Sequence, residues 1–386
     1  MTLNLQNCFS HTVPEANKKF IAACLASEGH IEQCKHHLVD PEGKALYTSV
    51  AWLGAKEAEH IILLVSGTHG NEGWAGSAIM IDSLKCGLFR DLPPNTAVMM
   101  IHLINPWGCA WGRRENEDNC DIFRDLIYYK PELYPDDSKF DKAIYEALTL
   151  HSYDNEERRQ SDKATKQLLK KYGQIGLTRI IRAGQFRYPN APCYNGGGIS
   201  WSFKLYQDLV NRYLKNAKRI LCVDIHTAFG EYGDGILIPY YKPDSSDKAK
   251  FEFLTQFYGS EKLFVAGFDP GIPSHPRMPY EIATDFVPGL EMIATGLEFG
   301  TYEWDDALNL IKYMNYLFVY GDLKTPERPD LVEQYRQLCY PDNDGWREMV
   351  ISRSREVMQQ TLAGMSGWLE SLESTVKTKG FRNSCD

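Results

Sequence analysis

The chain has 386 residues, of which 43% are hydrophobic and 24% are charged, and its formal net charge is -9. These values are ordinary for a globular protein, and the length is sufficient for one large α/β domain with a sizeable core. The acidic balance argues against a nucleic acid or an anionic membrane as partner, because both favour basic surfaces.

Cysteine spacing and the N-terminal segment bear on the cellular compartment. The ten cysteines form no CxxC pair, which favours neither a zinc ribbon nor a disulfide framework. The first twenty residues lack the apolar segment of a secretory signal, and no stretch approaches eighteen consecutive apolar residues. We therefore expect a cytoplasmic protein with reduced thiols and no membrane contact. Whether it forms a homo-oligomer stays open.

Hydrophobic periodicity and turn residues predict the elements in chain order. In the first half they are a helix at 15–28, strands at 45–53 and 61–65 joined as a hairpin through 54–57, a helix at 73–84, a strand at 98–104 and charged helical material at 139–184. In the second half they are a glycine-rich loop at 189–198, a helix at 201–214, strands at 220–225 and 235–241, a proline-rich loop at 269–279, a strand at 294–299 and helices at 304–320 and 346–372. This order predicts a single α/β domain over residues 1–386, with its core at about 45–320 and a helical extension at about 321–386.

Potential metal ligands follow two of the buried strands. His69 and Glu72 lie on the turn after the strand at 61–65, and His226 ends the strand at 220–225. Two imidazoles and one carboxylate leave a fourth position open, which is the arrangement of catalytic zinc sites. Taken singly, the HxxE spacing is weak, and an isolated strand histidine is typical of a packed core. For the same reason we expect His102 to be a core histidine, whereas His275, in the proline-rich loop, is expected to be exposed.

Several further motifs follow in order. They are Asn105-Pro106, Arg113-Arg114-Glu115-Asn116, Asn119-Cys120-Asp121-Ile122-Phe123-Arg124, Val223-Asp224-Ile225-His226-Thr227 and Leu297-Glu298-Phe299-Gly300. Together with the first turn they resemble the zinc carboxypeptidase superfamily, including its aspartoacylase and succinylglutamate desuccinylase relatives. The resemblance is greatest to an uncharacterised bacterial branch with a GQ…P…YGG…WS segment, here Gly184-Gln185 through Tyr194, Gly196, Gly197, Trp201 and Ser202.

The resemblance implies a fold and a metal site. The fold would be α/β and carboxypeptidase-like, with a mixed central sheet of about eight strands and helices on both faces. One zinc ion would be held by His69, Glu72 and His226. Asp121 would accept a hydrogen bond from His69 and so orient its ring, a role that raises ligand basicity. Asp224 either acts similarly or is structural.

The resemblance also implies catalytic and substrate-binding residues. Glu298 would be the general base, and Arg114 would stabilise the oxyanion. Arg124 would bind a substrate carboxylate, and Tyr280 is the candidate for a tyrosine that covers the substrate. Arg113 is expected at the surface, although sequence alone does not separate the two adjacent arginines.

Two departures from the family pattern affect the expected substrate. Phe123 stands where the pattern has asparagine, and Asp125 places a negative charge beside Arg124. The leading hypothesis is a zinc-dependent amide hydrolase of the carboxypeptidase type, acting on a peptide or an acyl-amino acid. The alternatives are an N-acyl amino acid deacylase and a non-catalytic metal-binding relative.

Overall fold

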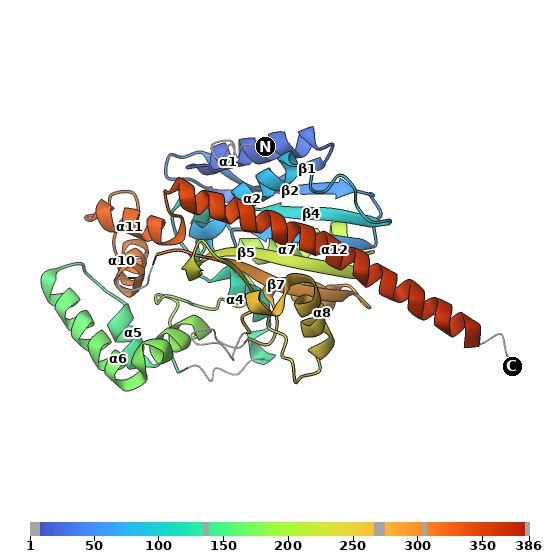
Figure 1. Cartoon of the computed structure of the whole chain (residues 1–386). Helices are drawn as coiled ribbons and strands as arrows, with labels where there is room; N and C mark the ends of the chain where they lie inside the picture. The colour runs from blue at the N-terminus through green and yellow to red at the C-terminus, as the bar shows by residue number, and fades with distance from the viewer. Residues whose placement is uncertain (1–7, 134–138, 266–274, 303–306, 383–386) are drawn as a thin grey trace.

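A seven-stranded mixed β-sheet runs through the middle of the molecule (Figure 1). The computed structural model describes residues 8–133, 139–265, 275–302 and 307–382. Its strand order is β1-β2-β4-β3-β5-β7-β6. The strands are β1 (His30–Val39), β2 (Ala45–Gly54), β3 (His60–Ser66), β4 (Thr96–His102), β5 (Arg219–Tyr232), β6 (Gly235–Ile238) and β7 (Glu291–Gly300). The described residues therefore form one strand fewer than the eight expected.

The four central strands are parallel and the outer ones are antiparallel. β4, β3, β5 and β7 run in one direction, whereas β1, β2 and β6 pair antiparallel with their neighbours. β3 and β4 are buried along almost their whole length, which explains their continuous apolar runs, because parallel strands are covered on both faces. The hairpin predicted through residues 54–57 is wrong, since β4 lies between β2 and β3.

Helices cover both faces of the sheet, as predicted (Figure 1). Along β3, Ile62 and Leu64 belong to one apolar core, and Ile61, Leu63 and Val65 belong to the other. The first core is closed by α1 (Val13–Ala26), α2 (Gly73–Lys85), α8 (Lys248–Tyr258) and α12 (Asp344–Arg382), and the second by α4 (Ile122–Ile127), α7 (Trp201–Leu209), the π-helix η4 (Val210–Leu214) and α9 (Ala283–Phe286). This alternation directs successive side chains of a central strand to opposite faces of the sheet.

A group of helices lies beyond one end of the sheet (Figure 1). It consists of α5 (Lys142–Leu148), α6 (Asn155–Ala183), α10 (Ala307–Val319) and α11 (Pro329–Cys339). The charged helical segment predicted at 139–184 is thus two helices, α5 and α6. The second of these, α6, is kinked at Gly173, which has φ +68°. Residues 304–306 of the predicted helix at 304–320 lie outside the described residues. Within the described ranges, none of the helices combines the length and apolar composition that crossing a bilayer requires.

Candidate metal centre and active site

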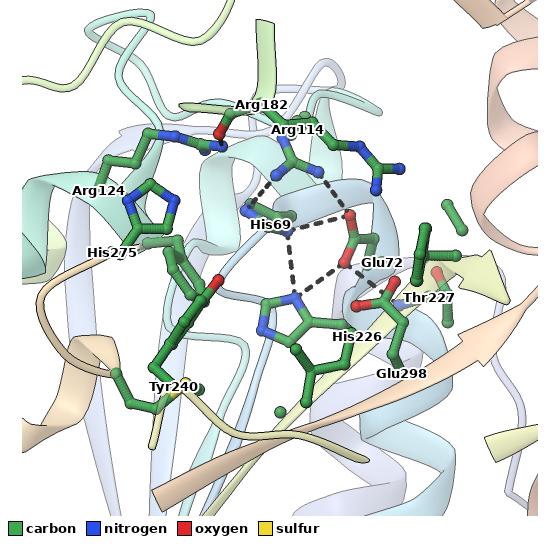
Figure 2. Close-up of a pocket in the computed structure, with 16 residues that line it drawn as sticks. His69, Glu72, Arg114, Arg124, Arg182, His226, Thr227, Tyr240, His275 and Glu298 are labelled. Atoms are coloured by element: carbon green, nitrogen blue, oxygen red, sulfur yellow. Dashed lines mark hydrogen bonds and ion pairs between the residues drawn. The ribbon is translucent and has the colours of Figure 1, made fainter. Parts of the chain in front are cut away.

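The three predicted metal ligands come together at the carboxyl edge of the parallel strands (Figure 2). His69 and Glu72 lie at the start and end of a short 3₁₀ turn, η2 (Gly70–Glu72), directly after β3. His226 lies on β5, the parallel neighbour of β3. Because parallel strands end at the same edge of a sheet, the topology brings these distant residues to one point.

The ligand atoms converge at the separations expected around one ion. His69 Nδ1 lies 3.2 Å from His226 Nδ1 and 3.0 Å from Glu72 Oε1, and His226 Nδ1 lies 3.0 Å from Glu72 Oε2. Two ligands of a tetrahedral zinc ion with bonds of about 2.0–2.1 Å would be roughly 3.3 Å apart. All three side chains are buried. The donor set therefore fits a divalent transition-metal ion.

The outer nitrogen of each histidine faces a carboxylate. His226 Nε2 donates to Asp224 Oδ2 at 2.6 Å, which leaves Nδ1 as the nitrogen directed at the shared point. His69 Nε2 lies 3.3 Å from Asp121 Oδ1. The His226–Asp224 pair is the carboxylate–histidine arrangement that orients metal ligands, whereas His69 Nε2 lies nearer to an Arg114 guanidinium nitrogen, at 2.7 Å, than to Asp121. Burial opposes a charge on His226, but Asp224 and Glu72 raise the pKa of its imidazole well above the usual value.

A close backbone contact holds the η2 turn in place. A Cβ on Gly70 would lie 2.2 Å from the carbonyl carbon of Gly108, so no larger residue fits there without a shift. The Gly70 amide also donates to the Arg114 carbonyl at 3.1 Å, and that of Asn71 donates to the Arg113 carbonyl at 2.9 Å. The turn is thus joined to the loop that carries the two arginines.

The two adjacent arginines have different surroundings. Arg114 lines the candidate site, and its guanidinium donates to Glu72 Oε1 at 3.0 Å and lies 2.7 Å from His69 Nε2. Arg113 is buried and donates to the Met314 carbonyl at 2.8 Å. The prediction that Arg113 lies at the surface is therefore wrong. Arg114 contacts the ligand set directly in this structure.

Arg124 lies at the cavity but is engaged by protein groups. Its guanidinium donates to Asp121 Oδ2 and to the Arg182 carbonyl oxygen. Burial opposes ionisation of Asp121, but the positive charges of Arg124, His69 and Arg114 hold its pKa well below the usual value. The ring of Phe123 packs with its centroid 6.1 Å from His69. An apolar ring, which offers no hydrogen-bond donor, therefore lies next to the ligand set.

Asp125 does not face the cavity. It accepts hydrogen bonds from the amides of Gly197 and Gly198, at 2.9 and 2.6 Å, and from the hydroxyl of Ser200. A Cβ on Gly196 would lie 2.6 Å from the Asp125 carboxylate, so this loop needs glycine for its close approach. The glycine-rich segment noted in the sequence is thus fixed by Asp125, whose charge is used within the loop.

Glu298 lies beside the ligand set on β7 (Figure 2). It is the register partner of His226 on β5, and neighbouring partners in a parallel pair project to the same face. Burial and the negative charge of Glu72 raise the pKa of Glu298 to about 8.

The cavity around these residues has a volume of about 100 Å³. Its lining includes residues that the sequence analysis did not select, namely Arg182, Phe229 and Tyr240. Arg182 lies in the last turn of α6, whose charged sequence predicts an exposed surface helix. The sequence pattern around Arg182 therefore does not indicate a site residue. Burial lowers the pKa of Arg182 to about 10. The cavity is thus partly aromatic and carries several cationic groups.

Two residues of the proline-rich segment differ from expectation. His275 is buried, lines the cavity and lies 2.9 Å from the Tyr128 hydroxyl, so its predicted exposure is wrong. Burial, with the charge of Arg124, lowers its pKa to about 3. Tyr280 is buried with its hydroxyl 2.6 Å from Thr68 Oγ1, which places it behind the site and not over the substrate position predicted for it. Residues 269–274 of the predicted loop lie outside the described residues.

A second group of potential metal ligands lies elsewhere in the described residues, but its side chains are hydrogen-bonded in a way that does not suit a metal ion. His36, His37 and Glu117 lie near one another, but His36 Nδ1 accepts the Leu38 amide at 3.1 Å. The proton of the neutral ring therefore sits on Nε2, which faces Glu117 Oε1 at 3.2 Å. This group is an internal histidine–glutamate pair. By contrast, His102 is a core histidine as predicted, within hydrogen-bond distance of Ser77 and Asn17.

Fold and site define a mixed α/β protein with a candidate metal centre at the carboxyl edge of its sheet. Solved structures similar to the chain include metallocarboxypeptidases and succinylglutamate desuccinylase-like proteins. Carboxypeptidase A from Helicoverpa armigera is 11% identical, with 90% of this chain and 74% of that chain covered and a TM-score of 0.41. Succinylglutamate desuccinylase from Chromobacterium violaceum is 16% identical, with 80% of this chain and 74% of that chain covered and a TM-score of 0.35. A metallo-carboxypeptidase from Burkholderia cenocepacia is 12% identical, with 79% of this chain and 68% of that chain covered and a TM-score of 0.35.

The chain belongs to the family of proteins of unknown function DUF2817, which matches residues 9–353. No curated protein matches the chain.

Proposed function

We propose that this protein is a zinc-dependent hydrolase of amide bonds, of the carboxypeptidase type. The observation that supports this best is the meeting of His69 Nδ1, His226 Nδ1 and the Glu72 carboxylate at 3.0–3.2 Å, with Glu298 beside them. His69, Glu72 and His226 would hold one zinc ion. A bound zinc ion supplies a Lewis acid and lowers the pKa of a coordinated water to about 7.

The chain's own residues supply the proton transfers and the fixed charges. Glu298 would take a proton from the attacking water and return it to the leaving nitrogen. Arg114 carries a positive charge beside the ligand set and would stabilise the oxyanion that develops on the scissile carbonyl. Asp224 and Asp121 would keep the two imidazoles in the orientation that the ligand set requires.

The second candidate function is an N-acyl amino acid deacylase with the same centre. Arg124, the predicted carboxylate anchor, already donates to Asp121 and to the Arg182 carbonyl, and Phe123 replaces an amide donor. Both features weaken the usual carboxypeptidase contact with a C-terminal carboxylate. The anionic group of either substrate would lie among the guanidinium groups of the cavity.

The test combines metal analysis with substrate panels. Zinc-replete protein is assayed with peptides and with N-acyl amino acids, and bound zinc is measured by elemental analysis. We expect one zinc ion per chain, and Glu298→Gln should keep it while kcat falls by about 10²–10⁴-fold. Glu291→Gln, at the exposed start of the same strand, is the matched control. Undiminished turnover by zinc-loaded Glu298→Gln would refute the assignment, and full zinc occupancy without any turnover would indicate a non-catalytic relative.

A further inference from the structure

A second cavity adjoins the candidate active site, between α6 and α10. Its apolar lining consists of Leu169, Leu177, Ile181, Cys193, Leu308 and Ile311. Arg114 and Arg182 line both this cavity and the one that contains the metal ligands. We call the second cavity the apolar chamber. The two guanidinium-bearing residues therefore mark the boundary between the ligand set and the apolar chamber.

The kink in α6 shapes the apolar chamber. Gly173 adopts φ +68° and ψ +167°, so the helix changes direction there. Leu169 precedes the kink, whereas Leu177 and Ile181 follow it, and all three line the same cavity. In a straight helix, residues eight and twelve positions apart would lie about 12 and 18 Å apart along the axis, too far to line one small cavity. The kink thus lets both halves of α6 enclose one space, with α10 on its other side.

The chemistry of the lining defines what the chamber would hold. Its walls are mainly aliphatic, and two of its charged residues, Arg114 and Arg182, also line the active-site cavity. The third, Glu115, is paired with Arg113. A ligand that fits has an apolar tail and a polar head near Arg114 and Arg182. The volume, about 60 Å³, has room for about four to six water-sized groups, each needing about 10–15 Å³.

We propose that the apolar chamber binds an aliphatic acyl chain of the substrate, which makes this protein an N-acyl hydrolase for short to medium chains. This inference rests on the proposed amide hydrolysis. Arg114 donates to the ligand Glu72 and also lines the chamber, so an acyl chain on the carbonyl that Arg114 stabilises would begin next to the chamber. The chain would carry about four to six carbons beyond the carbonyl.

The first experiment varies the acyl chain of one amino acid from acetyl to decanoyl. Each methylene buried in the chamber should raise kcat/KM about fourfold, until the chamber is full and the gain stops. Thr178→Trp, on the chamber wall, should reduce the ratio of hexanoyl to acetyl kcat/KM to near one. The control is Ile175→Trp on the same helix, where the side chain is 57% exposed and the ratio should stay as in the wild type.

A second variant guards against a folding defect in Thr178→Trp. Ile311→Ala enlarges the chamber, so the preferred chain should become longer by one or two carbons. An unchanged chain-length profile in both variants would refute the proposal. A preference set by the amino-acid side chain, with no dependence on the acyl chain, would refute it equally.

A binding experiment separates this inference from the proposed function. Thermal stabilisation of the zinc-loaded protein is measured with acetate, butyrate, hexanoate and octanoate. Stabilisation should increase with chain length in the wild type and in Ile175→Trp, but not in Thr178→Trp. If stabilisation follows this pattern while no amide is cleaved, the chamber is supported and hydrolysis is refuted. If amides are cleaved without any chain-length effect in either assay, the chamber alone is refuted.

Discussion

Replacing Asp224 by asparagine tests how the site orients His226. In the structure Asp224 Oδ2 accepts from His226 Nε2 at 2.6 Å, and Oδ1 accepts from the Thr68 hydroxyl at 2.7 Å. The carboxylate is fully buried. An asparagine of nearly the same shape has one acceptor oxygen, so it can keep only one of these two bonds and must turn its amide donor toward the other group.

The expected effect is a weaker metal site in a folded protein. Loss of a carboxylate that orients a ligand histidine typically lowers metal affinity by about 10–100-fold, which corresponds to roughly 1.4–2.8 kcal/mol. The 2.6 Å contact of Asp224 with His226 is charge-assisted and buried, which argues for the upper part of that range. Zinc affinity should therefore fall by close to two orders of magnitude.

The assay is competition for zinc with a chromophoric chelator, together with the circular dichroism spectrum of the same samples. Asp208→Asn is the control, because Asp208 is 56% exposed in its ion pair with Arg212 and lies on α7, away from the ligands. If Asp224→Asn binds zinc as tightly as Asp208→Asn, the reasoning about ligand orientation is refuted. A normal spectrum with weakened zinc binding would support it.

Two further predictions concern the fold. Gly70→Ala should lower the free energy of unfolding, measured by urea titration, by about 1–3 kcal/mol, because the new Cβ would lie 2.2 Å from the backbone of Gly108. The control is Gly176→Ala on α6, where the nearest atom to a new Cβ is 3.5 Å away. Equal stability of the two variants would contradict this prediction. Burial lowers the pKa of His102 to about 3 in the folded protein. As the pH falls below about 6.5, the imidazole of His102 is therefore protonated in the unfolded chain before it is protonated in the folded one. Between pH 7 and 5 this one group should reduce stability by about 2 kcal/mol, and His102→Gln should remove that part of the pH dependence.

The central part of the fold could be predicted because its signals are local. β3 and β4 are buried on both faces and therefore read as unbroken apolar runs. β1 was missed because most of its residues are half-buried or exposed, and its sequence HIEQCKHHLV lacks a clear alternation. The hairpin between β2 and β3 was predicted from short spacing alone. Strand order depends on contacts between distant residues, and a short connection does not determine it.

The candidate site likewise contains residues that could be predicted from the sequence and residues that could not. His69, Glu72 and His226 could be named because each sits in a motif at a strand end, and parallel strands bring such ends together. The surroundings of Arg113 and Tyr280 could not be predicted, since both depend on how loops fold over one another. A buried arginine or tyrosine has no local pattern that separates it from an exposed one.

The engagement of Arg124 bears on which substrates the site selects. A substrate carboxylate is best held by two parallel N–H donors, yet both terminal nitrogens of Arg124 already donate, one to Asp121 and one to the Arg182 carbonyl. Asp121 is in turn the carboxylate that faces His69, so drawing Arg124 toward a substrate would disturb the support of a metal ligand. Selection by the apolar chamber avoids this conflict, because an acyl chain gains affinity from burial alone and leaves the Arg124–Asp121 pair intact. On this reasoning Arg124→Lys should impair zinc affinity more than it impairs the choice between acyl chains.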